Sequence, residues 1–125
     1  MKGILLSDFF EIISQDDHEN CLKTMVRINE KHPIFIGHFP KNPITPGVCI
    51  IQMAKEILMR KFGYAVQMKL GNNMKFMNPI NPLVNNTINI DIDYSRDADN
   101  LFCQVIVKNT DKCFCKFSAT WIPFA

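Results

Sequence analysis

Apolar and polar residues alternate near the start of the chain in a way that predicts a hairpin. The alternation over Cys21 to Ile28 is typical of a strand with one buried face, and an apolar run with β-branched members covers Phe9 to Ser14. The polar stretch 15–20 joins these two runs. We expect it to form the turn and to carry His18, which we interpret as a solvated loop histidine rather than a catalytic one.

The middle of the chain predicts one buried helix from about Pro46 to Phe62. Thr45 followed by Pro46 is a helix-start signal, because a threonine hydroxyl can accept from an early amide and proline is tolerated at the first helical position. Gly63 is the expected C-cap. The apolar residues cover most of the circumference, which predicts burial on several sides: Val48, Ile50, Ile51, Ala54, Ile57, Leu58 and Phe62. The polar residues fall on one stripe by helical spacing: Gln52, Lys55, Glu56 and Arg60.

Four further strand-like runs follow the helix, separated by polar or proline-rich turns. The order of strand, strand, helix and four strands predicts an α+β fold, in which one antiparallel sheet curls around a single central helix. A chain of 125 residues is expected to form one domain over 1–125. The runs are Val66 to Phe76 with a break at 71–73, Thr87 to Tyr94, Leu101 to Asn109, and Lys112 to Trp121.

Composition narrows the classes of function. A formal charge of +2 is too small to indicate nucleic-acid binding. The five cysteines are odd in number and lack the spacing of a metal or redox site, so we expect free thiols and no bound metal. The apolar run near the start of the chain is too short for a secretory signal, and no later run has the roughly 20 apolar residues of a membrane span. We therefore expect a cytoplasmic protein.

A proline-rich loop before the helix carries the candidate chemistry. Four prolines in 33–46 restrict the backbone and so fix the direction of His38, whose imidazole is substantially neutral at cytoplasmic pH and can act as a base. Gly47 leaves the first helical amides open to a ligand, and a carbonyl oxygen that gains negative charge can be held there. The alternatives are a histidine bonded to backbone and a glycine that permits close helix packing.

The same residues resemble a known signature. Gly37-His38-Phe39-Pro40, Asn42-Pro43-Ile44 and Pro46-Gly47-Val48 together resemble the active-site motif of the bacterial (3R)-hydroxyacyl-acyl-carrier-protein dehydratases of fatty acid synthesis, and Lys75 to Ile80 resembles the family's strand that ends in a proline turn. The resemblance implies a hot-dog fold and a lyase that eliminates water from a 3-hydroxyacyl thioester to give a trans-2-enoyl thioester. It implies His38 as base and Gly47, with Val48, as the oxyanion position. No metal or redox cofactor is implied.

One position departs from that motif. Gln52 lies fourteen positions after His38, where these dehydratases carry a glutamate or aspartate. An amide has no dissociable proton to give, although it can orient water or the substrate hydroxyl. Glu56, one turn further along, is a candidate for a relocated acid; the alternative is a surface partner of Lys55 or Arg60. We expect four residues to contact the substrate: Phe39, Pro46, Val48 and Glu56.

A single helix leaves one sheet edge and much of the polar stripe uncovered, so association is expected. The resemblance implies a homodimer or higher oligomer paired edge to edge, in which Gln52 faces His38 of the partner subunit. A heteromer in which a sister subunit supplies the acid is the other possibility. The implied carrier protein is acidic, and five basic residues are either a docking patch for it or scattered solubilising charges: Lys55, Arg60, Lys61, Lys69 and Lys75.

Three functions follow from these residues. The first is a dehydratase-like enzyme with Gln52 as a third member of its site. The second is a non-catalytic acyl-binding or partner subunit that has lost the acid. The third is a hot-dog thioesterase, which needs a carboxylate to activate water. We expect no direct chemical role for His32 and interpret Cys49 as a small buried hydrophobe rather than a nucleophile.

Overall fold

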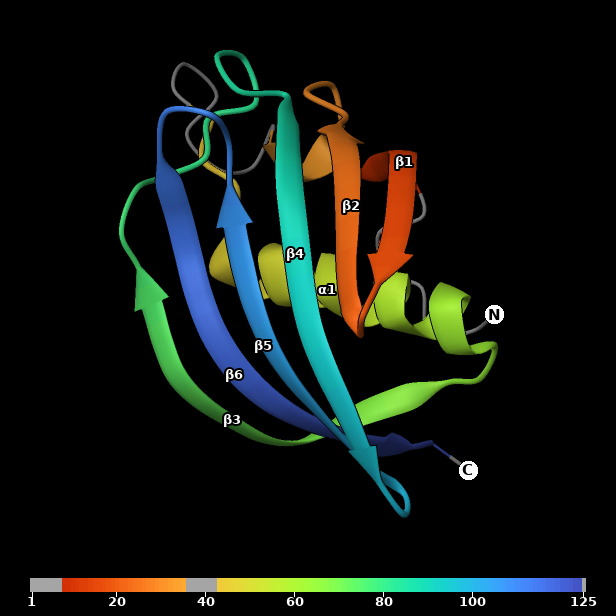
Figure 1. The fold of residues 1–125 in the computed structure, drawn as a ribbon. Coiled ribbons are helices and arrows are strands. Elements are labelled where there is room, and N and C mark those ends of the chain that lie inside the picture. Colours follow the sequence, from red (N-terminus) through yellow and green to blue (C-terminus); the bar gives the residue numbers. More distant parts are fainter. Residues whose placement is uncertain (1–7, 36–42, 125) are drawn as a thin grey trace.

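The structure is a computed structural model that describes residues 8–35 and 43–124. Within these ranges, one six-stranded antiparallel sheet curls around one α-helix, with strand order β1-β2-β4-β5-β6-β3 (Figure 1). The predicted α+β architecture, the hot-dog fold, is confirmed. The elements are β1 Phe10–His18, β2 Cys21–Ile28, a 3-10 turn Pro33–Phe35, α1 Gly47–Phe62, β3 Val66–Phe76, β4 Thr87–Asp97, β5 Asn100–Lys108 and β6 Cys113–Pro123.

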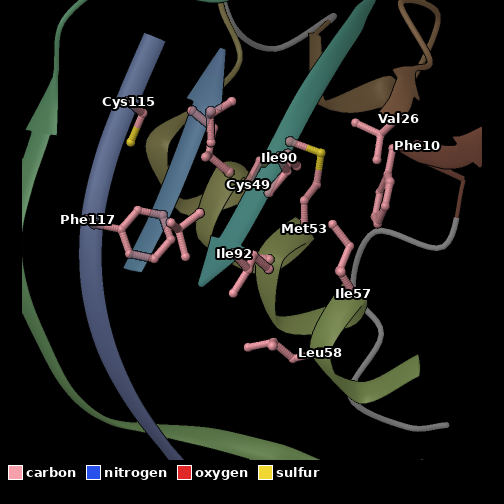
Figure 2. Close-up of a cluster of buried hydrophobic side chains, with 14 of the residues drawn as sticks. Phe10, Val26, Cys49, Met53, Ile57, Leu58, Ile90, Ile92, Cys115 and Phe117 are labelled. Atoms are coloured by element: carbon pink, nitrogen blue, oxygen red, sulfur yellow. The ribbon is translucent and has the colours of Figure 1, made fainter. Parts of the chain in front are cut away.

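The core lies between α1 and the concave face of the sheet. Alternate residues of β4, namely Ile88, Ile90 and Ile92, are fully buried, as period-two alternation requires of a strand with one covered face. Figure 2 shows Met53 of α1 beside Ile90 of β4, with Val26 of β2 and Phe10 of β1 on its other side. Each buried aliphatic side chain contributes roughly 1.5–3 kcal/mol relative to exposure, so this contact is the main source of stability.

The C-terminal cap of α1 was predicted correctly, and the N-terminal cap was not. Gly63 adopts φ 80° and its amide donates to the Met59 carbonyl at 2.9 Å. At the other end Pro46 is the N-cap, and no side chain caps the helix. Thr45 lies one residue too early, and its amide donates to the Ile80 carbonyl at 2.8 Å. Its Oγ1 is buried without a hydrogen-bond partner in the part of the chain that the structure describes.

The helix surface also differs from the predicted pattern. Val48, assigned to the apolar buried face, is 72% exposed, and Ile51 and Phe62 are only partly buried. Val48 and the half-buried Lys55 are two turns apart on one side of α1. This is the side that the described chain covers least.

The first hairpin turns later than its sequence predicts. β1 continues through the polar residues 15–18, and the turn consists of Glu19 and Asn20, whose φ values are 51° and 63°. His18 therefore ends a strand rather than lying in a loop, and its side chain is exposed. The same difference occurs between β4 and β5, where the predicted turn of 95–100 shortens to two residues. The exposed ends of β1 and β4 are rich in polar residues, and the sequence pattern alone does not distinguish such residues from those of a turn.

β3 runs without interruption through the predicted break at 71–73. The irregularity there is a shift of register against β6 between Asn72 and Lys75, and Asn73 has φ 54°. A bulge accommodates the polar residues without ending the strand.

The C-terminal end of α1 is anchored to the sheet by polar and aromatic contacts. The Asp17 carboxylate accepts hydrogen bonds from Lys61 Nζ and the Tyr94 hydroxyl, each at 2.7 Å, and these bonds lower the pKa of Asp17. The Arg96 guanidinium lies 4.6 Å from the centroid of the Phe62 ring. These contacts tie the end of the helix to β1 and β4.

The N-terminal end of α1 packs against β3 through Gly47. A Cβ added to Gly47 would lie 2.9 Å from Cζ and 3.0 Å from Cε1 of Phe76. The absence of a side chain at Gly47 therefore lets the Phe76 ring cover the first turn of the helix. Close helix packing is the alternative role that the sequence allows for Gly47. The contact with Phe76 supports that role, and it explains the absence of a side chain at this position without a bound ligand.

We expect Glu19→Asn to raise the free energy of unfolding by about 0.5–1 kcal/mol. A non-glycine residue at positive φ is strained, and asparagine tolerates this conformation better than glutamate. Urea unfolding of the two proteins measures the difference. Glu19→Gln is the control, since it removes the same charge but keeps the strain. An equal gain in both variants would assign the effect to charge instead.

A double-mutant cycle tests the packing of Gly47. Gly47→Ala in the otherwise unchanged chain is expected to be destabilising, because its methyl group meets the Phe76 ring. In a Phe76→Ala background the same change is expected to be neutral or stabilising, since alanine favours helix. The two effects should differ by about 1 kcal/mol in thermal or urea unfolding. Additive effects would show that the ring does not limit this position.

Candidate active site

The predicted base lies outside the described residues. His38 and Phe39 belong to 36–42, so their roles as base and substrate contact remain predictions. The chain on both sides of this segment is anchored. Phe35 is buried and stacks on Phe9 with ring centroids 5.4 Å apart. Thr45 is bonded through its amide to Ile80.

The first turn of α1 has the amides that an oxyanion site requires. The Cys49 and Ile50 amides both donate to the Pro46 carbonyl, at 3.0 and 3.3 Å. The Gly47 and Val48 amides precede them, at the positions where a helix has no acceptor of its own and where its dipole is positive. The Phe76 ring lies over Gly47, so a thioester that reaches this amide must pass beside that ring.

Gln52 and Glu56 lie together one turn apart on α1. Gln52 Nε2 is 3.4 Å from Glu56 Oε2. Glu56 is 1% exposed, and its Oε1 has no hydrogen-bond partner in the described chain. The alternative that Glu56 is a surface partner of Lys55 or Arg60 is wrong, since the residue is buried and the described residues show no ion pair between it and either cation.

The environment of Glu56 favours its neutral form. Burial raises the pKa of this carboxyl above its ordinary value, and the Gln52 hydrogen bond and the fields of Arg60 and Lys55 oppose that rise without cancelling it. A carboxyl that keeps its proton is a potential proton donor. The sequence held a signal for this burial: Glu56 follows Cys49 by two turns and Met53 by one, and both are buried.

The other candidate nucleophiles and bases have structural roles. His32 Nδ1 accepts from the Ile34 amide at 3.1 Å, and its ring packs on Phe9 edge to face. Cys49 is buried and burial raises its thiol pKa, which confirms its interpretation as a small hydrophobe. The five thiols are free, as predicted. The described residues hold no cluster of metal-ligating side chains.

The basic residues considered for docking lie on α1 and β3. Lys61 is engaged by Asp17, whereas Arg60, Lys69 and Lys75 are exposed and Lys55 is half-buried. Their role in docking remains a prediction. Neither helical segment in 8–35 and 43–124 has the length and apolar character needed to cross a membrane.

Comparison with curated proteins finds acyl-carrier dehydratases. The chain is 27% identical over 114 residues to the 3-hydroxyacyl-acyl-carrier-protein dehydratase FabZ of Wolbachia sp. subsp. Brugia malayi, covering 81% of this chain and 66% of that protein. It is 33% identical over 86 residues to the FabZ of Caulobacter vibrioides strain NA1000, covering 62% of this chain and 52% of that protein. The chain thus spans between half and two thirds of the length of these relatives.

Solved structures share the fold at low sequence identity. A chain of the dehydratase heterocomplex ApeI:P from Xenorhabdus doucetiae matches with a TM-score of 0.71 and 18% identity, covering 90% of this chain and 96% of that one. A hypothetical thioesterase with coenzyme A from Streptococcus pneumoniae matches with a TM-score of 0.65 and 9% identity, covering 93% of this chain and 86% of that one.

The family model of the ApeI-like dehydratases matches residues 14–117, a range that includes the proline-rich loop with His38 and the whole of α1. The chain therefore belongs to the ApeI-like family of FabZ/FabA-like dehydratases.

Proposed function

We propose that the protein eliminates water from a 3-hydroxyacyl thioester carried by an acyl carrier protein, giving a trans-2-enoyl thioester. The observation that carries the proposal is the family match across 14–117, which joins the histidine motif to α1 in one continuous segment. The curated relatives are named for this reaction. The proposed pathway is fatty acid synthesis or a related route of acyl-chain synthesis.

In the proposed reaction, each part of the site carries out one step. His38 takes the proton from the carbon next to the thioester carbonyl. The Gly47 and Val48 amides bind the carbonyl oxygen as it gains negative charge. The hydroxyl then leaves the adjacent carbon as water, near Gln52 and Glu56, while Phe39, Pro46 and Val48 contact the acyl chain. This chemistry uses only side chains and backbone amides of the protein.

A non-catalytic partner subunit is the second candidate, and Gln52 is the observation that favours it. An amide at the position of the family's acid retains hydrogen bonding but cannot supply a proton. In that case a sister subunit completes the site. Adding such a subunit would then be required for turnover.

We further propose that two chains associate along β3. β3 is an eleven-residue edge strand in which every residue after Met68 is exposed, so its outer backbone groups are open to pairing. Its exposed apolar residues continue just past the strand end: Leu70, Met74, Phe76 and Met77. A second copy, or a sister subunit with the same edge, would cover them.

We expect His38→Ala to abolish dehydration while the protein stays folded, because the variant loses the proposed base. Mass spectrometry of a 3-hydroxyacyl carrier substrate measures the loss of one water. His18→Ala is the matched control, since His18 is exposed at the end of β1 and should have no effect. Release of free acid would identify a thioesterase instead. Turnover only after addition of a sister subunit would favour the partner role.

We expect Leu70→Glu together with Phe76→Glu to convert a dimer into monomers. Charges placed on a paired edge oppose association, and both positions are exposed in the single chain, so folding should be preserved. Light scattering after gel filtration gives the molecular mass. Leu83→Glu, an exposed leucine outside β3, is the control. A dimer that persists in the double variant would place the interface elsewhere.

A further inference from the structure

We propose that Glu56 is the proton donor to the departing hydroxyl, in place of the acid that the family motif has at Gln52. The inference rests on the proposed function and assigns one more catalytic residue to that site. It also changes the role of Gln52, which here orients the hydroxyl and the carboxyl.

The burial of Glu56 is the first argument. A carboxyl that is almost fully buried is retained only at a cost, because an apolar side chain of similar volume would usually be more stable. A structural role would require that both carboxyl oxygens have partners. Oε2 has Gln52, but Oε1 has none among the residues that the structure describes. Oε1 therefore has the capacity to bind a hydroxyl oxygen.

The distance to Gln52 is the second argument. Gln52 Nε2 donates a hydrogen bond to Glu56 Oε2 at 3.4 Å, so the amide orients the carboxyl and leaves Oε1 as the oxygen that can carry the proton. In the proposed reaction the substrate hydroxyl approaches this oriented carboxyl. The amide supplies direction and the carboxyl supplies the proton.

The surroundings of Glu56 are compatible with its protonated form before the transfer and with its carboxylate form afterwards. Burial raises the pKa of the carboxyl and so favours its protonated form before the reaction. After the transfer, Lys55 and Arg60 are the charged groups of the described chain that stabilise the carboxylate, and both belong to α1. In the described chain neither forms an ion pair with Glu56, and their fields oppose the rise of its pKa without cancelling it.

The elimination balances with these two groups. His38 accepts the proton from the carbon next to the carbonyl, the carbon–oxygen bond of the hydroxyl breaks, and the oxygen leaves as water with the proton of Glu56. Histidine is then protonated and Glu56 is ionised. One proton passes from the imidazolium to the carboxylate through water, and the resting state is restored without any other reactant.

Four proteins test the assignment: the unchanged chain, Glu56→Gln, Gln52→Glu and the double variant that exchanges the two residues. We expect Glu56→Gln to lower kcat by about 10²–10⁴-fold, the usual contribution of a general acid. The double variant should recover at least about tenfold over Glu56→Gln, because it returns the acid to the family position. Gln52→Glu alone should not increase kcat, since a donor is already present. Glu11→Gln, an exposed carboxylate bonded to Arg27, is the unchanged control.

The outcomes separate this inference from the proposed function. If the unchanged chain does not dehydrate the substrate, alone or with a sister subunit, the proposed function fails and the inference fails with it. If the unchanged chain is active and Glu56→Gln stays within about threefold of it, the inference alone is overturned. The kcat of the unchanged chain should also fall as pH rises through the pKa of Glu56, and this limb should be missing in Glu56→Gln.

A measurement of stability does not depend on activity. Because the folded protein holds the Glu56 proton more tightly than the unfolded chain does, the unchanged chain should be most stable relative to Glu56→Gln at low pH. It should lose that advantage as pH rises through the folded pKa. Thermal unfolding of both proteins from roughly pH 4 to pH 8 measures this. A difference that does not change with pH would overturn the inference, since Glu56 would then have no retained proton to donate.

Discussion

The burial of α1 in the concave face of the sheet is the constraint on which the rest of the structure depends. A helix of sixteen residues satisfies its own backbone hydrogen bonds, so the sheet can cover it from several directions if its side chains are apolar. Met53, Ile57 and Leu58 meet this condition and are completely buried. The curl of the sheet and the position of its edges both follow from enclosing this one element.

Such a helix makes any polar side chain within it significant. A glutamate at position 56 contradicts the pattern that holds around it, and its cost is not offset by an ion pair in the described chain. Sites where a local rule fails without structural compensation are expected to be functional. Glu56 is also paired with Gln52, the one position where the motif departs from its family. The buried glutamate and the glutamine at the motif's acid position thus lie side by side. Both are explained if the acid has moved one helical turn along α1, from position 52 to position 56.

Local signals in the sequence were sufficient to predict the order of the elements, but not the packing around the candidate site. Period-two alternation and the all-round apolar helix predicted the element order, and Gly63 predicted the helix end, because each signal is local. Thr45 failed as a cap because the helix begins at Gly47 with Pro46 as its N-cap, while the Thr45 amide is hydrogen bonded to Ile80, a residue far away in the chain. The burial of Glu56 and the contact of Gly47 with Phe76 likewise depend on tertiary packing. No alternation of polar and apolar residues specifies which chain segment covers a given helix face.

Phe76 connects the site to the edge of the sheet. Its ring covers Gly47 at the start of α1, yet the residue is 54% exposed and ends the edge strand β3. A chain paired along β3, as proposed, would contact this ring and fix its position over the helix start. The access of a thioester to the Gly47 and Val48 amides would then depend on the partner as well as on the chain itself. Pairing of two chains along β3 would therefore affect binding of the thioester carbonyl, because the Phe76 ring belongs both to the β3 edge and to the start of α1.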